Sequence, residues 1–373
     1  MKSKFYSLKN ILKYDSTYYI IFGERSNGKT YSVLQYHLQQ WQKDKSQLAI
    51  VRRWQEDFRG KRGASLYNAL VTNGEISKWT NGEWDDVYYY SYRWYFCKKD
   101  ENGKRVVADE PFAYGFALTN MEHDKGNSYP NIKTILFDEF MSREGYLPDE
   151  FVTFMNTIST IVRYRDNVKI FMCGNTVNKY SPYFDEMGIK ILDMEKGEIR
   201  PYAYGDSDRI KIVVEYADSV NKTKDSDIYF AFDNPKLKMI MGGDWELAQY
   251  PHFPQQWDKN GNKIRLKPSD ILFTYFIQFG EELLQCEIVQ YCGDIFTWIH
   301  RKTTEIKNPD DDLIYDIEFN PKANYRRRIT RPTSDIEKRI LDFYTTEKVF
   351  YQDNEVGEVV RNYLDWCKTA KIK

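Results

Sequence analysis

The first half of the chain alternates short apolar runs with longer stretches of helical character. Four runs have the length and composition of buried strands: residues 17–23, 47–52, 134–137 and 168–173. Residues 28–42 lack proline and glycine after Gly28, and residues 149–162 have apolar positions at helical spacing. Because strands that alternate with helices form parallel sheets covered on both faces, we predict an α/β fold for this half.

Residues 85–118 interrupt this alternation with aromatic and β-branched runs on either side of an Asn102-Gly103 turn. Asn-Gly between two such runs is a strong signal for a β-hairpin. We therefore predict a β-hairpin inserted into the α/β layer.

The pattern changes after the first half. Residues 206–227 and 242–267 are polar and rich in turn-forming residues. Aromatic runs then predict an antiparallel meander of three strands, at residues 271–279, 283–291 and 295–301. Amphipathic stretches predict two helices, at residues 335–344 and 356–370. We expect three parts: an α/β domain at residues 1–220, a linker or lid region at 221–264 and a smaller α+β domain at 265–373.

Composition narrows the possible classes of protein. The 373 residues include 54 Lys and Arg and 55 Asp and Glu, so the formal net charge is −1. This balance argues against a polybasic protein that coats nucleic acid through charge alone. Five scattered cysteines suit a reducing compartment. No apolar run is long enough to span a bilayer, and the N-terminus lacks the apolar core of a signal peptide. We expect a soluble, intracellular protein with no membrane association.

The most specific motif is the segment from Gly23 to Thr30, which fits G-x-x-x-x-G-K-[ST]. It follows a predicted strand and opens a predicted helix, as a phosphate-binding loop does. Backbone N–H groups and the helix N-terminus would bind phosphate oxygens, Lys29 would bridge the β- and γ-phosphates, and Thr30 would bind Mg²⁺. The alternative is a surface loop before a helix. The predicted nucleotide-binding residues are Gly23, Glu24, Arg25, Ser26, Asn27, Gly28, Lys29, Thr30 and Tyr31.

Polar side chains follow two further predicted strands. Asp138 and Glu139 end the run at 134–137; we expect Asp138 to help hold Mg²⁺ and Glu139 to polarise the attacking water. A glutamate directly after the aspartate favours ATP hydrolysis over phosphate transfer to another substrate. Asn175 follows the run at 168–173 and would sense the γ-phosphate or position water, unless it only forms a turn.

Together these residues resemble ring ATPases of the additional-strand, catalytic-glutamate class of P-loop proteins. More narrowly, they resemble the terminase-like DNA-packaging ATPases of phi29-like small tailed bacteriophages. The resemblance covers about residues 5–185 and rests on FYSLKNILKYD, IVRRW, NSYPNIKTILFDEF, TIVRYRDNVKIFMCGN and SPYF.

The resemblance implies an ATP- and Mg²⁺-dependent motor that works in the host cytoplasm. Such motors form homomeric rings, typically pentamers, on the portal of an empty capsid and drive double-stranded DNA inward. In this resemblance Arg163 matches an arginine finger that acts on the neighbouring subunit's γ-phosphate, and Lys125 matches a second residue acting in trans. Arg165 is an alternative finger. The alternatives are that Arg163 complements the dipole at a helix C-terminus and that Lys125 is a solvated loop lysine.

DNA contacts are less specific in the sequence. Arg59, Lys61 and Arg62 form a compact basic loop after the second strand, suited to DNA phosphates. Two other basic segments could bind DNA: Lys98, Lys99, Lys104 and Arg105 at the hairpin tip, and the arginines of residues 325–331. The second segment could instead bind a portal or a structural RNA. Each segment could also be an ordinary solvated loop. Arg52 and Arg53 would contact Glu139, a phosphate, or an ordinary ion-pair partner.

The C-terminal strand pattern fits the RNase H-like nuclease domain that many large terminase subunits carry. Such nucleases hold two metal ions with clustered carboxylates, but the run at 271–279 has no acid, and Asp294 and Asp316 form no convincing cluster. We therefore expect a degenerate, inactive nuclease domain. The main hypothesis is a DNA-packaging motor; the alternatives are a terminase with an active nuclease, a helicase or plasmid-transfer ATPase, and a nucleotide-gated DNA-binding switch or assembly protein.

Overall fold

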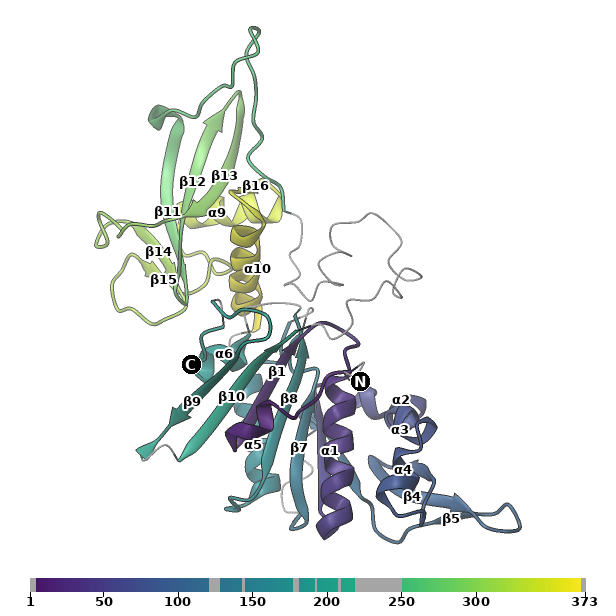
Figure 1. Cartoon of the computed structure of the whole chain (residues 1–373). Coiled ribbons are helices and arrows are strands. Elements are labelled where there is room, and N and C mark those ends of the chain that lie inside the picture. Colours follow the sequence, from purple (N-terminus) through teal and green to yellow (C-terminus); the bar gives the residue numbers. More distant parts are fainter. Residues whose placement is uncertain are drawn as a thin grey trace. The chain divides into compact units, whose positions relative to one another are not determined.

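The structure is a computed structural model that describes residues 5–120, 128–142, 145–176, 181–191, 193–206, 209–218 and 250–369. The chain divides into two compact units, Met1–Glu246 and Leu247–Lys373. Figure 1 shows the elements of each unit.

The first unit is built on a ten-stranded sheet with the order β3-β4-β6-β2-β7-β8-β1-β10-β9, in which β5 pairs with β4. Six strands that are neighbours in this order run parallel: β6, β2, β7, β8, β1 and β10. Their carboxyl ends therefore meet at one edge, which we call the catalytic edge. The strands are β1 (Tyr18–Gly23), β2 (Gln47–Arg52), β3 (Asp86–Tyr90), β4 (Arg93–Lys99), β5 (Arg105–Val107), β6 (Ala113–Ala117), β7 (Ile132–Asp138), β8 (Lys169–Asn175), β9 (Ile199–Tyr204) and β10 (Ile210–Ala217).

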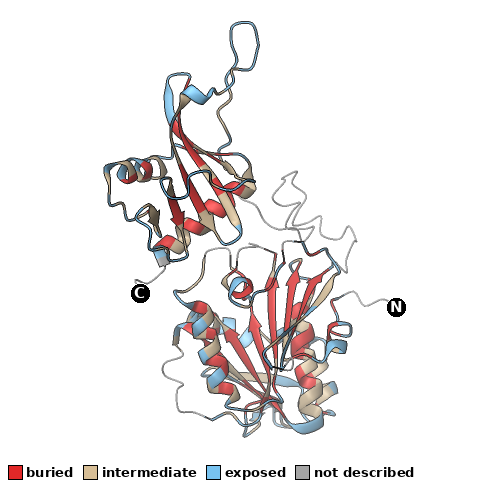
Figure 2. Ribbon diagram, turned by 90° about the vertical axis from the view of Figure 1, so that its left-hand side faces the viewer, coloured by how far each residue is buried: buried red, intermediate tan, exposed pale blue. Residues whose placement is uncertain are grey.

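Two apolar cores lie on the opposite faces of this sheet. Tyr19 and Ile21 of β1 pack with α1, whereas Ile20 and Phe22 pack with α5 and α6. A strand buried on both faces needs a continuous apolar sequence, which is why this run has no polar alternation. Figure 2 shows buried residues concentrated in the strands. The helical elements are η1 (Ile11–Tyr14), α1 (Lys29–Asp44), η2 (Gln55–Phe58), α2 (Lys61–Ser65), α3 (Asn68–Thr72), α4 (Glu75–Trp79), α5 (Glu150–Val162) and α6 (Pro182–Glu186).

Two parts of the first unit differ from the sequence-based expectation. The prediction of a turn-rich segment at 206–227 is wrong for Ile210–Ala217, because this segment forms β10 and pairs in parallel with β1. The insertion at 85–118 does contain a hairpin around Asn102-Gly103, between β4 and β5. It also extends the main sheet, because β6 pairs in parallel with β2 and antiparallel with β4.

The second unit contains a six-stranded sheet with the order β15-β14-β11-β12-β13-β16. The predicted meander is confirmed: β11, β12 and β13 are successive antiparallel neighbours, and β14 adds in parallel beside β11. The turn Cys292-Gly293 has positive φ at both residues, as a type I′ hairpin requires. The elements are η6 (Pro268–Asp270), β11 (Ile271–Phe279), β12 (Glu282–Tyr291), β13 (Asp294–Arg301), β14 (Leu313–Asp316), β15 (Tyr325–Arg326), α9 (Asp335–Thr345), β16 (Val349–Tyr351) and α10 (Asn354–Thr369).

Residues before β11 also belong to the second unit. Phe253 and Ile264 pack against the core formed by Val289, Tyr291 and Phe296. Residues 250–264 are thus part of this unit, whereas the linker expected between the units remains a prediction for residues 221–249, which lie outside the described residues.

Candidate nucleotide site at the catalytic edge

The phosphate-binding loop lies between β1 and α1, as its motif predicts. Gly23 has φ +151°, and a Cβ atom there would lie 2.5 Å from the carbonyl oxygen of Ala217 in β10. Gly28, with φ +93°, precedes the first residue of α1. Both positions therefore require glycine, and they bring the loop backbone to the N-terminus of a 16-residue helix, where unpaired N–H groups attract anions.

Lys29 is folded back into this loop, with its ammonium group among oxygen atoms. Its Nζ atom donates to the carbonyl oxygen of Glu24 at 2.6 Å and to Oδ1 of Asn175 at 3.3 Å. It also reaches the carbonyl oxygen of Gly23 and Oδ1 of Asn27, both at 3.4 Å. Burial lowers the pKa of Lys29 to about 8. Among the described residues nothing pairs with the buried Nδ2 of Asn27, so this cradle has an unused donor for a phosphate oxygen.

Asp138 and Thr30 meet at the end of β7. The Thr30 hydroxyl donates to Oδ1 of Asp138 at 2.6 Å, and the Arg52 guanidinium forms an ion pair with the other carboxylate oxygen. Hydroxyl and carboxylate oxygens are ligands that Mg²⁺ prefers in proteins, so these two side chains fit a magnesium site beside the phosphate loop. Of the partners considered for Arg52, the structure selects an ion pair with Asp138.

Glu139 lies directly beyond Asp138 and is exposed, with φ +59°. Asn175 lies at the end of β8, the strand between β7 and β1, and its side chain contacts Lys29. The structure thus brings Lys29, Thr30, Asp138, Glu139 and Asn175 to one edge of the sheet, as the sequence predicted.

Arg163 lies at the other end of the unit. α5 begins with Glu150, after the carboxyl end of β7, and ends at Val162 before β8 begins. Its 13 residues span about 20 Å, so Arg163, which is exposed at the C-cap, lies at the edge opposite the phosphate loop. Arg163 is therefore remote from the nucleotide site of its own chain.

Arg165 has a different environment from Arg163. Its guanidinium donates to five backbone carbonyl oxygens, those of Tyr129, Pro130, Ile132, Ile161 and Val162. These bonds fasten the end of α5 to the segment before β7, so Arg165 has a structural role. Lys125 lies outside the described residues.

Comparison with known proteins identifies the family. Residues 1–221 match the podovirus DNA encapsidation protein (Gp16) family, which covers more than half of the 373 residues. The chain belongs to the Gp16 family.

Relatives of this Gp16-family chain include the DNA packaging proteins of Bacillus phage phi29 and Bacillus phage B103. They are 28% and 24% identical to it over 189 residues each. The matches cover 49% and 50% of this chain and 50% and 52% of those proteins, so the chain spans about half the length of the relatives that it matches.

Two solved structures have the same fold as this Gp16-family chain. The bacteriophage Phi-29 viral genome packaging motor assembly gives a TM-score of 0.57 at 18% identity, covering 96% of this chain and 97% of that one. The Phi-28 gp11 DNA packaging motor gives 0.54 at 17% identity, covering all of both chains.

The basic segments of this Gp16-family chain differ in their surroundings. Arg59, Lys61 and Arg62 are exposed just after β2, with Arg59 3.5 Å from a carboxylate oxygen of Glu56. The β4–β5 hairpin also carries exposed basic residues and projects from the unit (Figure 1). By contrast, Arg326 forms an ion pair with the buried Glu337, so the run at 325–328 is not simply a solvated loop.

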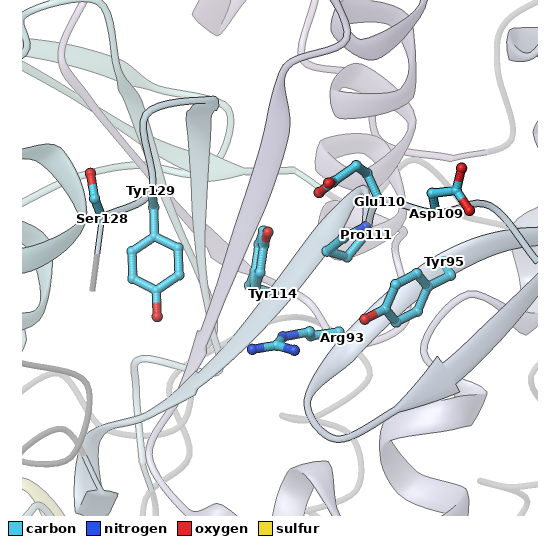
Figure 3. A pocket seen from close by; sticks show the side chains of 8 residues that line it. All are labelled: Arg93, Tyr95, Asp109, Glu110, Pro111, Tyr114, Ser128 and Tyr129. Carbon is cyan, nitrogen blue, oxygen red and sulfur yellow. The ribbon is translucent and has the colours of Figure 1, made fainter. Parts of the chain in front are cut away.

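An open groove of about 410 Å³ lies away from the nucleotide site (Figure 3). Tyr114 and Tyr129 form its aromatic wall, with ring centroids 5.4 Å apart, and Arg93 lies 6.0 Å from the Tyr114 ring. Because these residues come from the amino ends of β6 and β7, the groove lies at the edge opposite the phosphate loop.

The two acids considered as nuclease ligands lie on different strands of the second unit, because Asp294 begins β13 and Asp316 ends β14. Asp316, at the end of β14, lies opposite Gln278 of β11, and burial raises the pKa of its carboxyl group. In the described part of the chain, no group of three or more His, Cys, Asp or Glu side chains could hold a metal ion. None of the described helices combines the length and apolar character needed to cross a bilayer.

The sequence did not predict the partners of Arg53. Its guanidinium forms a buried ion pair with Glu150, the first residue of α5, and also contacts the backbone that follows Asp138. The only signal was the pair of arginines at the end of an apolar strand, which does not specify which carboxylate each one meets.

Proposed function

We propose that the chain is a Mg²⁺-dependent ATPase motor that translocates double-stranded DNA into a viral procapsid through its portal. The observation that carries this proposal is the contact between Thr30 and Asp138 beside the phosphate loop, in a chain of the Gp16 family. The DNA-packaging names of its relatives support the choice of substrate.

Each residue at the catalytic edge has a role in this proposal. Residues 23–31 hold the phosphates of ATP, with Lys29 bridging the β- and γ-phosphates. Thr30 and Asp138 hold Mg²⁺, which when bound neutralises charge on the phosphates. Glu139 orients the attacking water and accepts its proton, and Asn175, already in contact with Lys29, is placed to meet the γ-phosphate.

The arginine finger comes from the neighbouring subunit. Arg163 is exposed at the edge remote from its own phosphate loop, so it contributes only to another subunit's site. A cation there would stabilise charge that develops on the transferred phosphoryl group. The arrangement repeats head to tail, which closes into a ring; family resemblance favours a pentamer. Lys125 is proposed as a second residue acting in trans.

Double-stranded DNA would be held by phosphate contacts without reading its sequence. Arg59, between η2 and α2, and Lys61 and Arg62, which begin α2, are exposed in the segment that follows β2 at the catalytic edge, where a nucleotide-dependent movement would reach them directly. A ring repeats these phosphate contacts once per subunit, so a chain with a net charge near zero can still bind DNA. The further partners that we propose are the portal, the procapsid and a structural RNA. The proposed place of action is the host cytoplasm.

The second unit is proposed to be a degenerate RNase H-like domain. A three-stranded antiparallel meander with β14 added in parallel beside its first strand supports this fold. The Gln278–Asp316 pair, in place of a carboxylate cluster, supports the loss of nuclease activity over the alternative of an active terminase.

The test is ATP turnover by the full chain at increasing protein concentration, with and without double-stranded DNA, beside Arg163→Ala. We expect turnover per chain to rise with protein concentration and with DNA, and Arg163→Ala to lower turnover at least about a hundredfold. Mixing the variant with wild type should lower the turnover of the wild-type chains by more than dilution alone would. Arg163→Lys is the control for charge alone.

Turnover that is independent of concentration, DNA and Arg163 would exclude the ring motor. A nucleotide-gated switch would then explain the site better.

A further inference from the structure

Arg53 and Glu150 form an ion pair beneath the catalytic edge. Nε of Arg53 lies 2.7 Å from Oε2 of Glu150, and Nη2 lies 2.8 Å from Oε1, so the contact is bidentate. The two residues are only 6% and 2% exposed. The pair joins the residue after β2 to the first residue of α5.

Glu150 has further partners on both carboxylate oxygens. Oε2 also accepts from the backbone N–H of Leu147 at 2.7 Å, and Oε1 accepts from the Tyr183 hydroxyl at 2.6 Å. Removing two charges from water carries a large cost, so such a pair is a poor way to gain stability compared with apolar packing. The several hydrogen bonds of the pair point instead to a role in holding a particular geometry.

The other side of Arg53 holds the backbone around Glu139. Nη2 donates to the carbonyl oxygen of Phe140 at 2.8 Å, and Nη1 to that of Glu139 at 3.4 Å. The Phe140 N–H donates to the carbonyl oxygen of Cys173 in β8. Glu139 has φ +59°, a left-handed conformation that few non-glycine residues adopt and that surrounding contacts must maintain.

We propose that Arg53 and Glu150 are positioning residues that hold Glu139 in its left-handed conformation and thereby place its carboxylate for hydrolysis. This inference rests on the proposed function, in which Glu139 activates water. Arg53 supplies the hydrogen bonds to the backbone, and Glu150 fixes the orientation of the guanidinium. Both residues are proposed to act through the backbone of Glu139 and not through the nucleotide.

The experiment measures kcat and KM for ATP in Arg53→Lys, Glu139→Gln and the double variant, with DNA present. Lysine keeps the charge but lacks the planar fork that reaches Glu150 and two carbonyl groups together. We expect Arg53→Lys to lower kcat about 10- to 100-fold, as for other misplaced catalytic groups, with KM within about twofold of wild type. Arg200→Lys, a change at an exposed ion pair of the same unit, is the matched control and should behave as wild type.

The double variant separates positioning from a general structural effect. If Arg53 acts through Glu139, Arg53→Lys should cause little further loss once Glu139 is already glutamine. Independent, multiplicative losses would overturn the proposal, as would wild-type kcat in Arg53→Lys. Should that variant not fold, Tyr183→Phe removes one bond to Glu150 and must lower kcat without changing KM, or the proposal fails.

The two proposals fail in different ways. Wild-type turnover in Glu139→Gln would remove the proposed catalytic role of Glu139 itself. An inactive Glu139→Gln beside a fully active Arg53→Lys would leave that role intact and refute only the positioning by Arg53.

Discussion

At the scale of single residues, buried polar side chains determine what the catalytic edge can do. Lys29 and Asp138 are 6% and 4% exposed, and each is already bonded to groups from other strands. These bonds hold both charges at the site, and the Lys29 ammonium would exchange its loop oxygens for phosphate oxygens when a nucleotide binds.

A buried histidine of α1 makes the first unit sensitive to acid. His37 is fully buried, its Nε2 lies 3.1 Å from the carbonyl oxygen of Ser46, and burial lowers its pKa to about 4. Between pH 6.5 and about 4 the unfolded chain binds a proton that the folded chain does not, so stability falls as the pH falls through this window. The loss approaches roughly 3 kcal/mol at the acid end.

We therefore predict that His37→Gln reduces the fall in calorimetric melting temperature between pH 6.5 and pH 4. The exposed His252 provides the control, because His252→Gln should keep the wild-type slope. An unchanged slope in His37→Gln would show that other groups cause the acid sensitivity.

The sequence could predict which residues form the nucleotide site but not how they pair. The motif Gly23–Thr30 fixes a loop through its spacing, and Asp138 follows a recognisable apolar strand. The partners of Arg52 and Arg53 depend on which strands become neighbours and on the position of α5. Adjacent arginines with different partners cannot be told apart by spacing alone.

At the scale of elements, the strands with continuous apolar sequence were predictable, and β10, which lies between β1 and β9, was not. β2 and β11 have the predicted bounds, because continuous apolar runs leave little choice. β10 was missed because its start is exposed and charged, while its second half is buried by β1 and by the N-terminal segment, where Tyr6 donates to Glu215. Tertiary contacts of this kind override local composition.

The two arginines after α5 should separate in their effects on stability and activity. Arg165→Ala removes five hydrogen bonds to backbone carbonyls and should cost roughly 2 kcal/mol in the free energy of unfolding. Arg163→Ala should change stability by less than about 0.5 kcal/mol, because the side chain is exposed, yet abolish hydrolysis.

Chemical denaturation and ATP turnover of both variants provide the measurement. If Arg163→Ala were the less stable protein and Arg165→Ala the inactive, stable one, the roles assigned to the two arginines would be reversed.

At the scale of the whole molecule, the two units carry different amounts of chemistry. The first gathers its polar side chains at the carboxyl ends of parallel strands, the usual site of ligands in such sheets. The second has a well-packed core, with Tyr275 and Leu284 fully buried. Its buried Glu337 pairs with Arg326, and Asp316 lies beside Gln278. Among its described residues, no group of three or more His, Cys, Asp or Glu side chains could hold a metal ion.

We therefore predict that the full chain leaves supercoiled and linear DNA intact in Mn²⁺ as well as Mg²⁺, and that Asp316→Asn behaves as wild type. Gel analysis after prolonged incubation is the measurement. Cleavage that Asp316→Asn abolishes would instead assign an active nuclease to the second unit.

The oxygen atoms around the Lys29 ammonium would affect the end of each turnover in the proposed ATPase cycle. An arriving phosphate must replace the oxygen atoms to which Lys29 is already hydrogen-bonded. The loss of these bonds offsets part of the attraction between the phosphate and the ammonium group. In the proposed motor, a spent nucleotide would leave by the reverse exchange, in which the Lys29 ammonium returns to the loop oxygens. Product release is often the slowest step of an enzyme cycle. Hydrogen bonds from Lys29 to the loop would therefore speed the release of ADP and shorten the interval between successive translocation steps.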